Sequence, residues 1–211
     1  MSKTHVAPGR LGGFVNGRLA AGLVALGLLG ACAAPPPAPD DQFYRLDLVA
    51  SNPGPTVLDG VIEVDRFVAS GALANRPLLF SQPGSNAVSE YHYHFWMEPP
   101  PILLQSALVS YLRSDNVATR VVTPEMRTTP NYSIMGRILR MEVVRGANPV
   151  GAVTFELTLR RESDDKLLVL GEYRSEMPAG ANGMQTDVAA IELAAKEAFA
   201  NFVADIRAIK P

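Results

Sequence analysis

The sequence predicts an α+β domain, in which one mainly antiparallel sheet has two amphipathic helices packed on a face. Two observations support this prediction. Short segments with alternating apolar and polar residues recur between residues 43 and 176, separated by hairpin-length turns, as is typical of half-buried strands. Two further stretches, one after the prolines at 99–101 and one between 188 and 206, have apolar residues at helical spacing. Hydrophobic residues make up 47% and charged residues 19% of the chain, a globular composition.

The expected elements alternate as strands, helix, strands, helix. The expected strands are 43–49, 57–68, 78–81, 88–95, 117–122, 133–144, 152–161 and 166–176. The apolar positions of the first helix are Ile102, Leu104, Leu108, Tyr111 and Leu112, and those of the second are Val188, Ile191, Ala195, Phe199, Phe202 and Ile206. A helix with a single apolar stripe packs on a core, so both helices are expected to cover the sheet.

The amino-terminal segment has the three parts of a secretory signal. Arg10 and Arg18 precede an apolar run over 19–29, which is too short to cross about 30 Å of hydrocarbon comfortably as a helix. Small residues follow, and Leu29-Gly30-Ala31-Cys32 resembles the bacterial lipobox. Cys32 is the only cysteine, so we expect cleavage between Ala31 and Cys32 and lipidation of the thiol. An ordinary signal peptide and an uncleaved anchor are the alternatives.

These features divide the chain into three parts. Residues 1–31 form the expected signal peptide, 32–41 the lipidated cysteine with a proline-rich tether, and 42–211 a periplasmic domain. Several acyl chains would give stable anchoring, because a single chain binds a membrane only marginally. Ala33 follows the cysteine where an aspartate would otherwise stand, and by analogy with enterobacterial sorting this favours the periplasmic face of the outer membrane over the inner membrane.

Charge and cysteine content exclude several classes of function. Residues 32–211 contain 16 Lys and Arg against 21 Asp and Glu, without a basic cluster, so nucleic acid is not an expected partner. The single cysteine excludes an intramolecular disulfide and a structural cysteine zinc site. The sequence also lacks a Gly-x-Ser-x-Gly nucleophile elbow and a complete phosphate-binding loop. We therefore expect no catalytic residue, no cofactor and no enzyme activity.

An aromatic segment over 90–101 is the densest candidate site. Strand alternation would place Tyr91, Tyr93 and Phe95 on one face, and Glu90, His92, His94 and Trp96 on the other. Glu-x-His-x-His could present three metal ligands. We prefer the interpretation that the strand has an aromatic core face and a hydrated polar face, and we predict no metal site.

The quoted residues also carry a family resemblance. The pattern consists of Phe43-Tyr44-x-Leu46, Val61-x-x-Val64-x-x-Phe67 and Tyr91-x-Tyr93-x-x-Trp96-x-Glu98-Pro99-Pro100 with the helix that follows. Over about residues 42–208 it resembles the ABC-type transport auxiliary lipoproteins, a group that includes the PqiC-like intermembrane transport lipoproteins. Trp-x-Glu-Pro-Pro is its most specific part, and the family's usual Arg before the Trp is Phe95 here.

The resemblance implies a non-enzymatic periplasmic component of an Mce-type system that transports lipid between membranes. It implies an Mce-domain protein, an ABC permease and an ATPase as partners, and self-association into a ring. Tyr91, Tyr93, Trp96, Glu98, Pro99 and Pro100 would then form a structural corner or a partner contact. A pilotin-like assembly lipoprotein for an outer-membrane complex is the alternative function, and the sequence does not identify the transported molecule.

Overall fold

A computed structural model describes residues 4–5, 38–180 and 183–209. The chain divides into two compact units, Met1–Pro39 and Asp40–Pro211, and the described elements all lie in the second. Ala31 and Cys32, with the predicted cleavage and lipidation sites, lie outside the described residues.

The second unit contains eight strands, two α-helices and two short 3₁₀ helices within its described residues. The strands are β1 (Gln42–Tyr44), β2 (Leu58–Val64), β3 (Pro77–Ser81), β4 (Val88–Trp96), β5 (Ala118–Val122), β6 (Tyr132–Val144), β7 (Val150–Arg161) and β8 (Lys166–Pro178). The helices are α2 (Pro100–Asp115), α3 (Met184–Ala208), η1 (Gly71–Ala74) and η2 (Pro124–Met126). The α+β class is confirmed, and the two short 3₁₀ helices are additions to the predicted elements.

All eight strands form one sheet, and the long strand β6 is its centre. One edge of β6 pairs with β7, which pairs with β8, and these three antiparallel strands are here called the meander. The other edge of β6 pairs with two groups of strands. Its first residues, 132–134, pair in parallel with β2, which carries β5, and its last residues, 143–144, pair in parallel with β3. Strands β1, β3 and β4, here called the tether wing, continue the sheet from that point.

The sequence predicted a mainly antiparallel sheet, and this prediction is corrected here because the sheet is mixed. Four pairings are parallel (β1–β4, β2–β5, β2–β6 and β3–β6), and three are antiparallel (β3–β4, β6–β7 and β7–β8). Hairpin-length turns predict the antiparallel pairs, whereas the parallel pairs join strands that are far apart in the sequence. The local sequence pattern therefore does not predict the parallel pairs.

The first expected strand, 43–49, is also corrected, because β1 ends at Tyr44. The chain must then travel from β1, beside β4, to β2, beside β5. The connecting segment contacts the end of α2: the Ala50 amide donates to Ser114 Oγ over 2.7 Å, and the Gly54 amide to the Asp115 carbonyl over 3.1 Å. Leu48 is buried in the core, so the loose alternation in 43–49 reflects core contacts made by a connecting segment.

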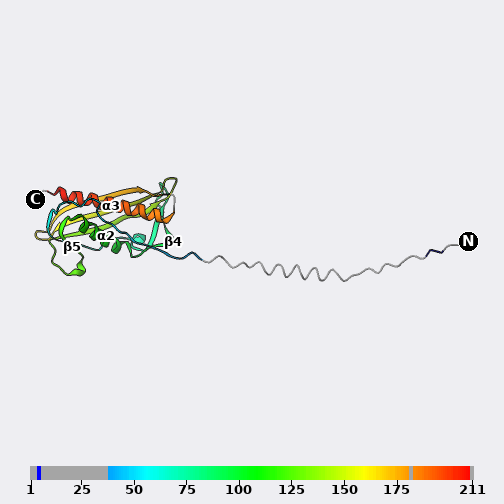
Figure 1. Cartoon of the computed structure of the whole chain (residues 1–211), viewed down its shortest axis with the longest axis horizontal. Helices are drawn as coiled ribbons and strands as arrows, with labels where there is room; N and C mark the ends of the chain where they lie inside the picture. The colour runs from blue at the N-terminus through cyan, green and yellow to red at the C-terminus, as the bar shows by residue number, and fades with distance from the viewer. Residues whose placement is uncertain (1–3, 6–37, 181–182, 210–211) are drawn as a thin grey trace. The chain divides into compact units, whose positions relative to one another are not determined.

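Both helices pack on the same core, as predicted, and Figure 1 shows α3 lying along the long strands. The Phe199 ring of α3 lies 5.6 Å from Phe155 of β7 and 6.0 Å from Tyr111 of α2. Small residues allow a close approach between helix and sheet: a Cβ added to Gly151 of β7 would lie 2.4 Å from the Ile191 amide nitrogen. No α-helix among the described residues packs on the other face of the meander, which is here called the open face.

Candidate functional site

The Trp-x-Glu-Pro-Pro motif forms the corner between β4 and α2. Trp96 closes β4, and only 2% of its surface is exposed. Its amide donates to the Arg76 carbonyl over 2.7 Å, and Arg76 Nε donates back to the Trp96 carbonyl over 3.0 Å. The indole is therefore a core side chain, and the loop before β3 holds the backbone of this residue.

The prolines of the motif occupy the first turn of α2. Pro99 is the N-cap, Pro100 is buried at the first helical position, and the Pro99 carbonyl accepts from the amides of Ile102 and Leu103 over 2.9 and 3.1 Å. A proline costs little there, because an amide in the first turn has no partner within the helix. Glu98 is exposed, so the motif contains one outward-facing acid beside a buried indole.

Strand β4 does not keep the alternation that the sequence predicted. Pro77 of β3 pairs with Phe95 of β4, and the next pair is Leu79 with Glu90. Between these two pairs β3 therefore advances by two residues and β4 by five. The extra residues shift the register, so that Tyr91 and His94 meet with ring centroids 5.7 Å apart, although they were expected on opposite faces. The expected grouping of Tyr91 with Phe95 is wrong for this reason.

Tyr91 and His94 belong to a polar cluster that was not predicted from the sequence. His94 Nδ1 lies 3.0 Å from the Tyr44 hydroxyl of β1, and the Arg145 guanidinium lies 5.0 Å from the centre of the Tyr91 ring. Arg145 Nη2 lies 3.3 Å from Oδ2 of Asp187, in the first turn of α3. The cluster therefore links β1, β4, the end of β6 and the start of α3.

Burial governs the electrostatics of this cluster. Asp187 is 2% exposed, and burial raises the pKa of its carboxyl, while the nearby Arg145 and His94 act in the opposite direction. The Tyr91 hydroxyl is buried without a hydrogen-bond partner among the described residues. An acid at the start of a helix is favourable, because it lies near the partial positive charge of the helix N-terminus. No local signal connects Asp187 with residues 91 and 145.

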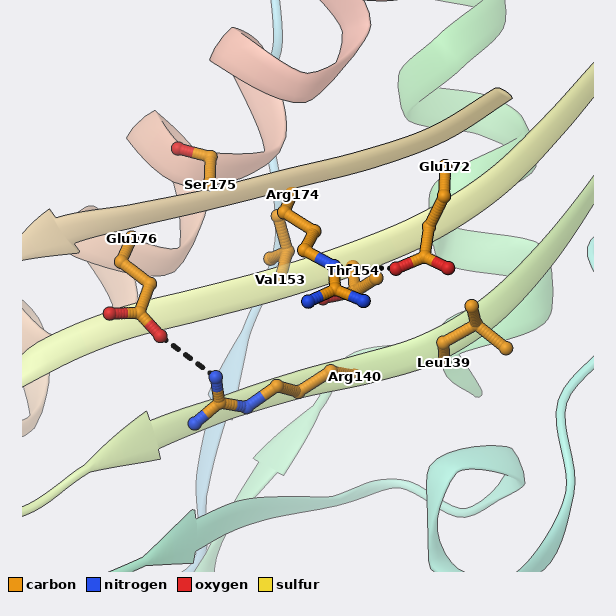
Figure 2. A pocket seen from close by; sticks show the side chains of 8 residues that line it. All are labelled: Leu139, Arg140, Val153, Thr154, Glu172, Arg174, Ser175 and Glu176. Carbon is orange, nitrogen blue, oxygen red and sulfur yellow. Dashed lines mark hydrogen bonds and ion pairs between the residues drawn. The ribbon is translucent and has the colours of Figure 1, made fainter. Parts of the chain in front are cut away.

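The open face carries a cavity of about 540 Å³, which Figure 2 shows from close by. Its charged side chains pair with one another: Arg140 lies 2.8 Å from Glu142 and 2.8 Å from Glu176, and Arg174 lies 2.5 Å from Glu172. In Figure 2, Ser175 points away from these groups, and its hydroxyl donates to Glu197 of α3. Both arginines of this wall are paired with carboxylates, and these ion pairs hold their side chains in place.

A second cavity, of about 520 Å³, shares Leu139 and Arg140 with the first and reaches the hairpin of β3 and β4 at Leu79 and Val88. Among the residues that the structure describes, no three His, Cys, Asp or Glu side chains gather as metal ligands would. Glu90, His92 and His94 therefore do not form the metal triad that their spacing allowed. None of the described helices has the length and apolar character needed to span a bilayer.

Comparison with known proteins identifies the family to which the chain belongs. The family model of the ABC-type transport auxiliary lipoprotein component matches residues 44–206. A crystal structure from Xanthomonas campestris, assigned to the family DUF330, is similar with a TM-score of 0.67 at 16% identity, over 77% of this chain and 92% of that one. An uncharacterised protein is similar with a TM-score of 0.65 at 15% identity, over 80% and 99%. No curated protein shows significant similarity to the chain. The chain belongs to the ABC-type transport auxiliary lipoprotein family.

Proposed function

We propose that this protein is a lipid-anchored periplasmic lipoprotein on the outer membrane, where it serves an Mce-type ABC system that moves lipid between membranes. The observation that carries the proposal is the family match over residues 44–206, which starts twelve residues after the cysteine of the lipobox-like segment. The family supports an accessory role beside an ABC transporter. The Mce-type system, the outer membrane and lipidation at Cys32 are our additions from the sequence.

The described surface is consistent with a docking subunit. The charged side chains in the cavity of Figure 2 are engaged in ion pairs within the domain, and the predicted motif contributes a buried corner. In the proposed system, ATP hydrolysis belongs to the ATPase subunit and substrate passage to the permease and the Mce-domain protein. This chain would meet the Mce-domain protein from the outer membrane, either as one copy or as a ring of identical copies.

Replacing the anchor residue tests the proposal most directly. Cys32→Ala should move the protein from the membrane fraction to the soluble periplasmic fraction, because no acyl chains can then be attached. Ala33→Asp is the matched variant: it keeps the cysteine and should shift the protein from the outer to the inner membrane. A Cys32→Ala protein that is cleaved yet stays in the membrane fraction would contradict the anchor.

The partners require a separate measurement. Chemical crosslinking in intact cells, followed by purification of this protein, should recover an Mce-domain protein with its permease and ATPase. Deleting the gene should increase detergent sensitivity while the partner remains at its normal level. Loss of a partner from the outer membrane would instead support the pilotin-like alternative, in which this lipoprotein assembles an outer-membrane complex.

A further inference from the structure

The outward side of the tether wing carries large apolar side chains beside the start of the domain. Phe43 of β1 pairs with Phe95 of β4, and their ring centroids lie 5.7 Å apart. Tyr93 and Met97 stand two residues on either side of Phe95 in the sequence, and both are exposed, whereas Trp96 is buried. Phe43 is 50% exposed, Tyr93 38% and Met97 50%. We call Phe43, Tyr93, Phe95 and Met97 the tether patch.

Two arginines accompany the tether patch. The Arg76 guanidinium lies 5.0 Å from the centre of the Phe43 ring, and its bond to the Trp96 carbonyl holds it there. Arg45 is exposed two residues beyond Phe43. Within the described residues, neither arginine takes part in an ion pair, so both can bind an external anion. Glu98, Asp40 and Asp41 are exposed acids close to the patch in the sequence.

The length of the tether limits how far the tether patch can lie from a membrane. Ten residue-to-residue steps lead from Cys32 to Gln42, the first residue of β1. A fully extended chain of that length reaches at most about 36 Å, and a proline-rich one about 31 Å. An acyl group on Cys32 would therefore keep Gln42, the residue before Phe43, within this distance of the lipid headgroups.

The composition of the tether patch matches a bilayer interface. Tyrosine and other aromatic side chains are favoured at the level of the headgroups, where an apolar ring and a polar end are both accommodated. Guanidinium groups bind phosphate, the group that every phospholipid presents there. Leu139 on the open face is exposed too, but it lies among charges that are already paired.

We infer that the tether patch docks on the phospholipid surface to which the chain is anchored. This inference rests on the membrane anchoring in the proposed function. Phe43, Tyr93 and Met97 enter the headgroup region while Arg76 and Arg45 bind lipid phosphates. The acyl chains then hold the protein at the membrane, and the patch fixes which face of the domain points toward the periplasm.

The single cysteine allows a direct test on the whole mature chain. The unlipidated chain beginning at Cys32 is coupled through its thiol to a maleimide lipid in vesicles of phosphatidylethanolamine and phosphatidylglycerol. Chloramine-T then oxidises accessible methionines, and mass spectrometry of peptides gives each rate. Met97, Met126 and Met135 are 50%, 53% and 55% exposed, so the last two are internal controls with matched exposure. Coupling should slow the oxidation of Met97 about fivefold or more and leave the other two within about twofold, as expected for side chains inside and outside the interface.

Variants separate the tether patch from general crowding at the vesicle surface. Phe43→Ser should restore much of the oxidation of Met97, whereas Leu170→Ser, a change on the open face, should not. An unchanged Met97 rate on coupling would overturn the inference, as would equal protection of all three methionines. Because the maleimide lipid replaces the natural anchor, this result does not depend on whether cells lipidate Cys32. Failure of the anchor is detected separately, by the fractionation of Cys32→Ala.

Discussion

The meander and the tether wing are parts of one sheet that are stabilised in different ways. In the meander, β6, β7 and β8 are each 12 or 13 residues long, and each pairing follows one register over most of its length with a single shift. In the tether wing, β1 has three residues and β3 five, and the register of β4 jumps. The meander relies on periodic burial against α3. The tether wing relies on specific contacts between aromatic and polar side chains.

This difference indicates where the molecule can carry function. A face that is buried by regular alternation leaves few side chains with unusual environments. The irregular β4, by contrast, brings His94 and Tyr91 to the same side and leaves Tyr93 and Met97 exposed beside the start of the domain. The candidate interaction residues therefore lie in the tether wing, and the meander with α3 holds that wing in place.

The largest effect is expected from removing the central side chain of the tether wing. Trp96→Ala should lower the free energy of unfolding by roughly 3–5 kcal/mol, because it leaves a large cavity at a site that is only 2% exposed. Urea titration of the Cys32→Ala form, followed by circular dichroism, measures the change. Tyr93→Ala is the matched control on the same strand and should cost much less, because Tyr93 is 38% exposed. Equal losses in the two variants would contradict a buried corner.

A smaller loss of stability is expected when a larger side chain is placed between the meander and α3. A Cβ on Gly151 would lie 2.4 Å from the Ile191 amide nitrogen, so Gly151→Val must push α3 away from β7. Overpacking of this kind costs about 1–3 kcal/mol. Thr158→Val, on the open face of the same strand, is the control and should be nearly neutral. Hydrogen exchange should locate the loss in α3 and β7; a loss confined to the tether wing would show that the two parts are not independent.

The sequence predicted the meander better than the tether wing, because the meander consists of long, regularly alternating strands. Alternation over 133–176 and the apolar stripe over 188–206 are local signals of long buried elements, and turn residues mark their antiparallel connections. The parallel pairings and the register shift in β4 depend on contacts between distant residues, so 43–49 was expected to be a longer strand than β1. In the candidate site, Trp96 and the prolines were identified from their motif. Arg145 was missed, and the exposure of Phe43 beside Arg76 follows only from the pairing of β1 with β4.

The smallest effect is expected at the exposed turn between β7 and β8. The hydrogen bond from Arg161 holds the pKa of the Asp164 carboxyl well below its usual range, at about 2. A lowered pKa in the folded state means that this pair stabilises the fold fully above about pH 4, and that the contribution is lost as the pH falls through about 2. Because the pair is exposed and screened by solvent, Asp164→Asn should lower the midpoint of thermal unfolding at pH 7 only slightly. An NMR titration of Asp164 gives the pKa. A clear loss of stability at pH 7 would show that the turn, as well as burial against α3, holds the meander together.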